Sequence, residues 1–100
     1  MKSSNSFVRY EEKVPNGKMV CFDVDSQAGR ITKVRITGDF FLYPEEKIIE
    51  IEKTLTGIPV GCNESEITSR ISAVLQNAKL IGATAEDFAR ILKKALSCGE

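Results

Sequence analysis

Residues 31–44 read ITKVRITGDFFLYP, and the hydrophobic pattern of the chain changes within this stretch. Before Gly38, Val34 and Ile36 alternate with basic residues, which is the period-two pattern of a strand with one buried face. After Gly38, the apolar residues recur at helical spacing. The stretch therefore predicts that strands precede it and that helices follow it.

The period-two pattern extends back to Ser6 and predicts two earlier strands. Two sequences suited to tight turns separate the three strands: Pro15-Asn16-Gly17 and Ser26-Gln27-Ala28-Gly29. Because short turns join neighbouring antiparallel strands, we expect a three-stranded antiparallel meander. The side chains expected on the buried face of the first two strands are Val8, Tyr10, Val14, Val20, Phe22 and Val24.

The first helix is predicted to begin at Pro44-Glu45-Glu46, because proline suits a first turn and carboxylates favour the positive end of a helix. Gly57 and Pro59 are expected to end it. Its apolar stripe consists of Ile48, Ile51 and Leu55, with Ile49 beside them. The acidic residues of the other side are Glu45, Glu46, Glu50 and Glu52. We expect them to face solvent rather than to form a metal or acid–base cluster.

Two further helices are predicted from capping residues. Asn63 can cap the second helix while Glu66 reaches back to it. Thr84 opens the third helix, with Asp87 three residues later. The positions expected to be buried in these helices are Ile67, Ile71, Val74, Leu75, Ala78, Phe88, Ile91, Leu92 and Ala95.

Strands followed by helices on one short chain are typical of an α+β fold, in which about three helices pack on one face of the antiparallel sheet. We expect a single domain over residues 6–96, because one hundred residues suit one hydrophobic core. Flexible ends are expected at residues 1–5 and 97–100.

Composition and charge exclude several classes of partner. Lys plus Arg and Asp plus Glu number 14 each, so no net field draws the chain to nucleic acid or to an anionic membrane. No segment approaches the ~20 apolar residues that cross a bilayer, and the N-terminus lacks a signal-peptide core. The cysteines Cys21, Cys62 and Cys98 are odd in number and outside any CxxC spacing, which favours a reducing cytoplasm.

The sequence offers little catalytic chemistry. Histidine is absent, which removes the side chain most often used for proton transfer near neutral pH. Neither a GxxxxGK[ST] phosphate loop nor a GxGxxG fingerprint is present. Structural or incidental roles are the ordinary expectation for Cys21 and Cys98. Cys62 lies just before a predicted helix N-terminus, where the helix dipole can lower a thiol pKa, but no second cysteine or histidine stands near it in the sequence, so a reactive role is the minor alternative. We therefore predict no catalytic residue, no metal site and no cofactor bound by the chain alone.

The segment Gly38–Tyr43 is unusual because four bulky apolar side chains follow one another from position 40 to position 43. Phe40 and Leu42 are expected to seal the core, which leaves Phe41 and Tyr43 exposed. Exposed aromatic side chains commonly mark protein interfaces. The residues predicted to form a partner interface are Gly38, Asp39, Phe40, Phe41 and Tyr43.

Several motifs resemble the accessory, or C-terminal, domain of lipoate-protein ligases. They are KVPNGK at residues 13–18, ITKVRITGDFF at residues 31–41, and then Pro44, Ile51-Glu52 and Leu55-Thr56-Gly57. The resemblance covers roughly residues 7–96, and its helical part is less specific than the Ile-x-Gly-Asp-Phe-Phe run.

The resemblance implies a non-catalytic accessory subunit of a two-part lipoate-protein ligase. A larger catalytic subunit would hold lipoate, ATP and Mg, and the two chains would form a heterodimer. In that family the accessory domain is needed to form lipoyl-adenylate and looks dispensable for transfer to the acceptor lysine, so lipoyl-acceptor domains would be indirect partners. The domain is often fused behind the catalytic domain, so the chain is either a separate subunit or an excised domain.

Three other readings compete with this one. An iron-sulfur or sulfur-relay scaffold would need the three thiols to converge. A lipoyl acceptor would carry an Asp-Lys pair at a hairpin tip, where this chain has Asn16-Gly17-Lys18. A general interaction module without any connection to ligases is compatible with the hydrophobic periodicity.

Overall fold

The computed structural model describes residues 6–15 and 18–98. Its main sheet is an antiparallel meander in the order β1 (Ser6–Lys13), β2 (Met19–Gln27) and β3 (Arg30–Gly38). The predicted meander is therefore confirmed. The turn residues Asn16 and Gly17, the predicted flexible end at residues 1–5, and the last two residues of the predicted flexible end at 97–100 lie outside the described residues.

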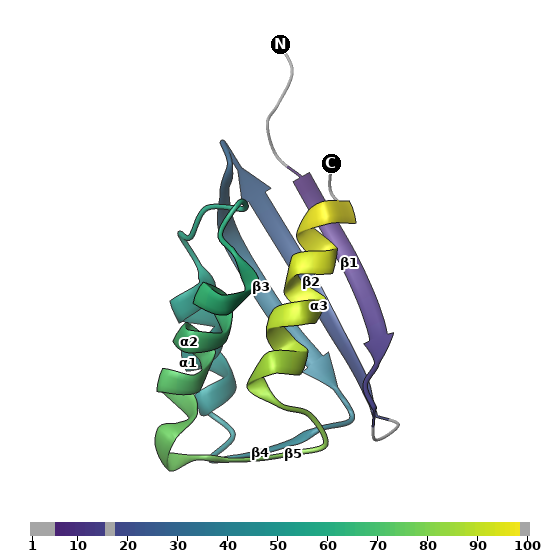
Figure 1. Cartoon of the computed structure of the whole chain (residues 1–100), viewed down its shortest axis with the longest axis vertical. Helices are drawn as coiled ribbons and strands as arrows, with labels where there is room; N and C mark the ends of the chain where they lie inside the picture. The colour runs from purple at the N-terminus through teal and green to yellow at the C-terminus, as the bar shows by residue number, and fades with distance from the viewer. Residues whose placement is uncertain (1–5, 16–17, 99–100) are drawn as a thin grey trace.

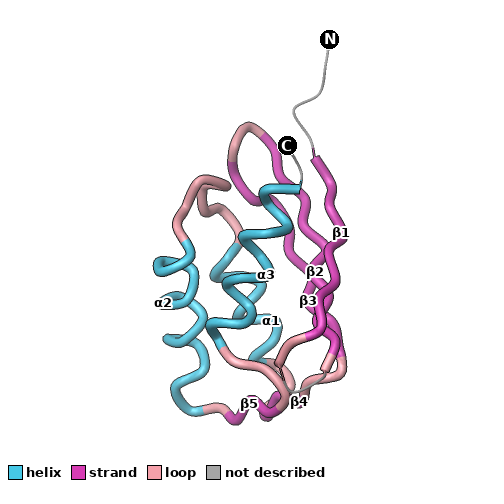
Figure 2. The backbone as a smooth tube through the Cα atoms, turned by 45° about the vertical axis from the view of Figure 1, so that its right-hand side comes forward, coloured by secondary structure: helices cyan, strands magenta, loops and turns pink. Residues whose placement is uncertain are grey.

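Three helices cover one face of this sheet, as Figure 1 shows. They are α1 (Lys47–Leu55), α2 (Glu64–Val74) and α3 (Ala85–Cys98). Helix α3 packs on β1 and β2, α1 packs on β3, and α2 packs against the two other helices. Figure 2 shows the same helical layer from a second angle, beside the sheet. The predicted α+β class is confirmed, and α3 continues through Cys98, beyond the expected domain limit at residue 96.

A second, two-stranded sheet was not predicted. Strand β4 (Phe41–Tyr43) pairs antiparallel with β5 (Lys79–Ile81). The prediction that Leu75 and Ala78 lie in the second helix is wrong, because α2 ends at Val74 and a short 3₁₀ helix, η1 (Leu75–Asn77), leads into β5. We call this pair of strands the ribbon.

The ribbon also displaces the start of the first helix. Helix α1 begins at Lys47 rather than at Pro44, because residues 41–43 are held extended by their pairing with β5. Residues 44–46 then form the turn from strand to helix, in which the Lys47 N–H donates to the Pro44 carbonyl at 3.0 Å. The predicted end of α1 before Gly57 is confirmed.

Side-chain caps fix the starts of the other two helices. The Asn63 side chain accepts a hydrogen bond from the Glu66 N–H at 2.8 Å. The Glu66 carboxylate does not reach back as predicted but pairs with Arg70 at 3.0 Å. Thr84 and Asp87 form a reciprocal capping box, in which each side chain accepts from the other residue's N–H at 3.0–3.1 Å.

The core lies between the sheet and the helices. The largest of its fully buried side chains are Phe22, Phe88, Ile31, Ile51, Leu55, Ile67, Ile71, Ile91, Leu92 and Val20. The prediction that Ile49 is buried with the apolar stripe of α1 is wrong, because its side chain is half exposed. A bulge near Asp25 and Ser26 lets Ile31 face the core together with Val34.

The outer edge of β3 is closed by groups from outside the sheet. The Ile36 N–H donates to the Glu52 carboxylate at 2.9 Å, so the prediction that Glu52 faces solvent is wrong. Farther along, Ile31 donates to the Ile58 carbonyl at 3.0 Å and accepts from the Gly57 N–H at 2.7 Å. A buried strand edge needs such partners, and α1 with the loop after it supplies them.

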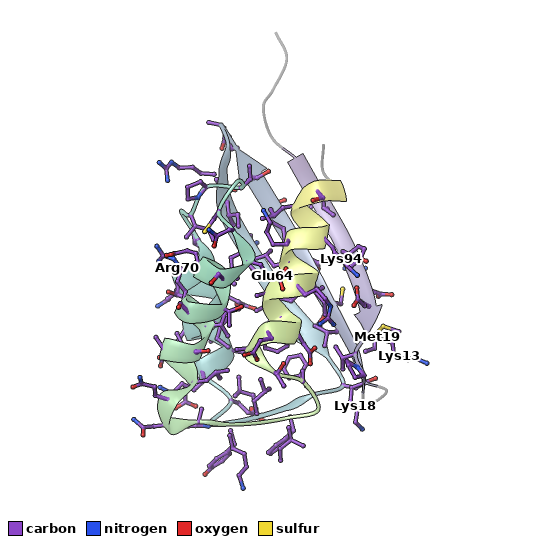
Figure 3. All side chains as sticks on the ribbon, in the orientation of Figure 1. Lys13, Lys18, Met19, Glu64, Arg70 and Lys94 are labelled. Carbon is purple, nitrogen blue, oxygen red and sulfur yellow. The ribbon has the colours of Figure 1, made fainter. Side chains whose placement is uncertain are left out.

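Glu12 of β1 ties the first strand to the last helix. Its carboxylate accepts hydrogen bonds from Arg90 at 3.1 Å and from Lys94 at 3.0 Å. Figure 3 shows Lys94 on α3, on the side of β1. Burial disfavours the charged form of Glu12, but the hydrogen bonds from Lys94 and Arg90 outweigh burial and hold its pKa below the ordinary value.

Replacing Glu12 by Gln should lower the free energy of unfolding by about 1 kcal/mol near neutral pH. Because the pKa of Glu12 is lowered in the folded chain, its stabilisation is present above the unfolded-state pKa of about 4.3. That stabilisation is lost as the pH falls through the folded-state pKa. Urea unfolding of wild type and variant should therefore differ most near neutral pH and converge in strong acid.

Glu11→Gln is the matched control, because Glu11 is exposed on the opposite face of the same strand. Its effect should stay within about 0.5 kcal/mol at every pH. Equal effects of the two substitutions would show that the contacts with α3 do not stabilise the fold.

Candidate docking surface

The two faces of the ribbon differ sharply in exposure. On the inner face Leu42 is only 5% exposed, while on the outer face Phe41 and Tyr43 are 53% and 64% exposed. Phe41 lies opposite Ile81, which is 53% exposed, and Tyr43 lies opposite the exposed Lys79. Directly opposed residues of a pleated pair share one face. These four residues, Phe41, Tyr43, Lys79 and Ile81, form what we call the ribbon patch.

The predicted interface segment, residues 38–43, therefore has side chains that face the core and side chains that face solvent, as its sequence indicates. Phe40 is half-buried, and its ring packs edge-on against Phe88 with the ring centroids 5.2 Å apart. Asp39 is exposed, and its N–H donates to the Met19 carbonyl at 2.9 Å. The alternation of Phe40 and Leu42 inward with Phe41 and Tyr43 outward is confirmed. That these residues contact a partner stays a prediction.

Two glycines hold the ribbon against the rest of the fold. Gly38 has a φ of +154°, and a Cβ there would collide with the Met19 carbonyl oxygen. Gly82 follows β5 with a φ of +99°, and a Cβ there would lie 3.2 Å from the Phe40 Cα. Both glycines lie at the end of the ribbon where Phe41 pairs with Ile81, and the close approach of the chain segments there requires glycine at both positions.

Sequence reasoning missed half of the ribbon patch. Lys79 and Ile81 were assigned to no element, because their face is set by pairing with a strand far away in the chain. A groove of about 330 Å³ beside β4 was also missed. We call it the β4 groove, and its lining residues are Ile36, Thr37, Gly38, Phe40, Phe41, Leu42, Glu45 and Ile48.

The ribbon lies at one end of the molecule, as Figures 1 and 2 show. The start of β1 and the end of α3 lie toward the opposite side of the molecule from the ribbon. A partner seated on the ribbon patch would therefore leave this opposite end of the domain accessible.

The open face of the main sheet has a different character. Arg9 binds Asp23 with two hydrogen bonds, at 2.8 and 3.2 Å, and this interaction holds the pKa of Asp23 below its ordinary value. Lys33 and Arg35 are exposed beside them, in the register that the alternation in β3 predicts. Paired and exposed charges of this kind suit contact with water.

The two cysteines whose side chains the structure describes, Cys21 and Cys62, do not converge. Cys21 lies on the open face, where burial and then the nearby Asp23 raise the pKa of its thiol. Cys62 packs against the core on the helical side of the sheet. Over residues 6–15 and 18–98, no group of three or more His, Cys, Asp and Glu side chains is placed to hold a metal ion.

The fold and this surface define a small α+β domain whose most distinctive exposed feature is an apolar patch at one end. The chain belongs to the family described as bacterial lipoate protein ligase C-terminus, whose model matches residues 5–92. The predicted resemblance is thereby confirmed. A comparison with curated protein sequences finds no match.

A solved structure supports the same assignment. The chain is similar to one from the structure of an archaeal lipoylation system, a bi-partite lipoate protein ligase and its E2 lipoyl domain from Thermoplasma acidophilum. The two chains are 25% identical with a TM-score of 0.67, and the match covers 91% of this chain and 97% of the other. Among the described helices, none has the length and apolar character needed to span a membrane.

Replacing Gly38 by Ala should lower the free energy of unfolding by about 2 kcal/mol, because the added methyl group has to displace the Met19 carbonyl. Gly61→Ala is the matched control, since no heavy atom lies within 4 Å of a Cβ at that position. Its effect should stay within about 0.5 kcal/mol. Chemical denaturation of both variants measures the difference, and equal stabilities would contradict the close approach of β2 and β3.

Proposed function

We propose that this chain is the non-catalytic accessory subunit of a two-part lipoate-protein ligase and docks on the catalytic subunit through the ribbon patch. The observation that carries the proposal is the exposure of Phe41 and Tyr43 within the segment that bears the family's Ile-x-Gly-Asp-Phe-Phe run. Aromatic side chains that are rigidly held and half exposed are frequent anchors of protein interfaces.

The proposal divides the work between two polypeptides. The catalytic subunit binds lipoate, ATP and Mg, and the accessory subunit is required for the step that joins lipoate to AMP. Lipoyl-acceptor domains are then indirect partners, which meet the complex after lipoyl-adenylate has formed. The complex works in the cytoplasm, in keeping with free cysteines at Cys21 and Cys62.

Docking can promote this step without contributing a reactive group. Lipoyl-adenylate is a mixed anhydride, which water hydrolyses, so an active site that forms it has to exclude solvent. A rigid domain seated beside such a site can order the loops that close over it. The accessory chain would supply shape and contact area, and the groups that bind ATP would belong to its partner.

A two-stage assay tests the division of labour. Adenylate formation from lipoate and ATP is measured with the catalytic subunit alone, with this chain alone and with both. Transfer of preformed lipoyl-adenylate to an acceptor domain is measured with the same three samples. The proposal expects adenylate only from the mixture and transfer without this chain, whereas ATP consumption by this chain alone would overturn it.

Phe41→Ala should weaken binding to the catalytic subunit by about 30-fold, or about 2 kcal/mol, because it removes an aromatic anchor from the patch. Adenylate formation at limiting concentrations should fall with the loss of binding. Calorimetry on the two purified chains measures the affinity.

Phe7→Ala is the matched control, since Phe7 is 63% exposed but lies on the open sheet face, outside the ribbon. It should leave affinity and adenylate formation unchanged. A larger loss of affinity from Phe7→Ala than from Phe41→Ala would place the docking surface on the open face of the sheet.

A further inference from the structure

The ribbon patch is too small to account for a stable complex. Fully exposed aromatic side chains offer roughly 150–250 Å² each, so three half-exposed apolar residues provide on the order of 300 Å². A standard interface buries about 800 Å² on each partner. The contact with the catalytic subunit has to continue from the patch onto a neighbouring surface.

The β4 groove is the apolar surface that adjoins the patch. The two surfaces share Phe41, which lines the groove and belongs to the ribbon patch. Ile36, Leu42 and Ile48 supply apolar walls from β3, β4 and α1, and Glu45 is the charged residue of the lining. A partner that covers Phe41 therefore reaches the groove directly.

The groove lies beside a strand edge that has no backbone hydrogen-bond partner among the described residues. Strand β4 pairs with β5 on one edge, and no β5 residue lines the groove, so the groove lies on the other edge. Among the described residues, none of Phe41, Leu42 and Tyr43 takes part in a backbone hydrogen bond outside the ribbon itself. The outer edge of β3 is closed by Glu52 and the loop after α1, whereas the edge of β4 is open.

We propose that the catalytic subunit places an extended segment along the free edge of β4. The inference rests on the proposed function and specifies how the partner binds. Main-chain hydrogen bonds to β4 would add the segment as a third strand of the ribbon, and an apolar side chain of the segment fills the groove between Ile36, Leu42 and Ile48. The residue beside Glu45 is basic or uncharged, because a carboxylate there would be repelled.

Glu45→Trp tests the groove, because Glu45 is an exposed lining residue and an indole there blocks the groove. Glu46→Trp is the matched control, because it removes the same charge at the next residue of the chain. Glu46 is also exposed but does not line the groove. Glu45→Trp should weaken binding to the catalytic subunit at least about tenfold, and Glu46→Trp should bind as wild type. Thermal unfolding of the free variants verifies that both fold.

Hydrogen exchange of the wild-type chain tests the strand pairing without any substitution. Amide exchange within residues 41–43 is compared between the free chain and the complex with the catalytic subunit. We expect at least about tenfold slower exchange on complex formation at the amides of the free edge. Unchanged exchange there would overturn strand addition.

The outcomes separate this inference from the function on which it rests. If wild type binds the catalytic subunit and supports adenylate formation while Glu45→Trp does so equally well, the inference fails and the proposed function stands. If wild type neither binds nor supports adenylate formation, both fail. If the free chain forms a dimer that Glu45→Trp abolishes, the occupant of the groove is a second copy of this chain and the inference is overturned.

Discussion

Phe88 of α3 contacts aromatic rings from two distant parts of the chain, and the arrangement of the rest depends on it. Its ring packs edge-on against Phe22 of β2 and against Phe40, with centroid distances of 6.0 and 5.2 Å. The sheet, the last helix and the entrance to the ribbon are thereby fixed to one another. Because Phe40 is held inward, the alternation of β4 turns Phe41 and Tyr43 to solvent. The exposed patch is thus a consequence of core packing.

The sequence predicts those parts of the fold whose signals are local. Alternation in β2 and β3, the turn at Ala28-Gly29 and the caps at Asn63 and Thr84 are each contained within a few residues. The ribbon could not be predicted in this way, because three-residue strands carry almost no periodicity and the paired residues are nearly forty positions apart in the chain. The same limit explains Glu52, which belongs to an acidic helix side by pattern but meets a strand edge in space.

Only part of the candidate docking surface could likewise be predicted from local sequence. Phe41 and Tyr43 could be predicted, because four bulky residues in a row cannot all face the core of one strand. Ile81, Lys79 and the groove wall formed by Ile48 could not, since each depends on elements that meet only after folding. A segment's own pattern shows that it is exposed, whereas the extent of the surface around it depends on tertiary structure.

The closed outer edge of β3 limits how copies of the domain can associate with one another at high protein concentration. A domain that presents open strand edge and aromatic side chains runs the risk of polymerising with its own copies, as unprotected sheets do in fibrils. With one side of the main sheet sealed by Glu52 and the loop after α1, the sheet can grow only past β1, whose outward side chains include Arg9, Glu11 and Lys13. The edge of β4 belongs to a strand of only three residues, which is too small a template to nucleate a fibre.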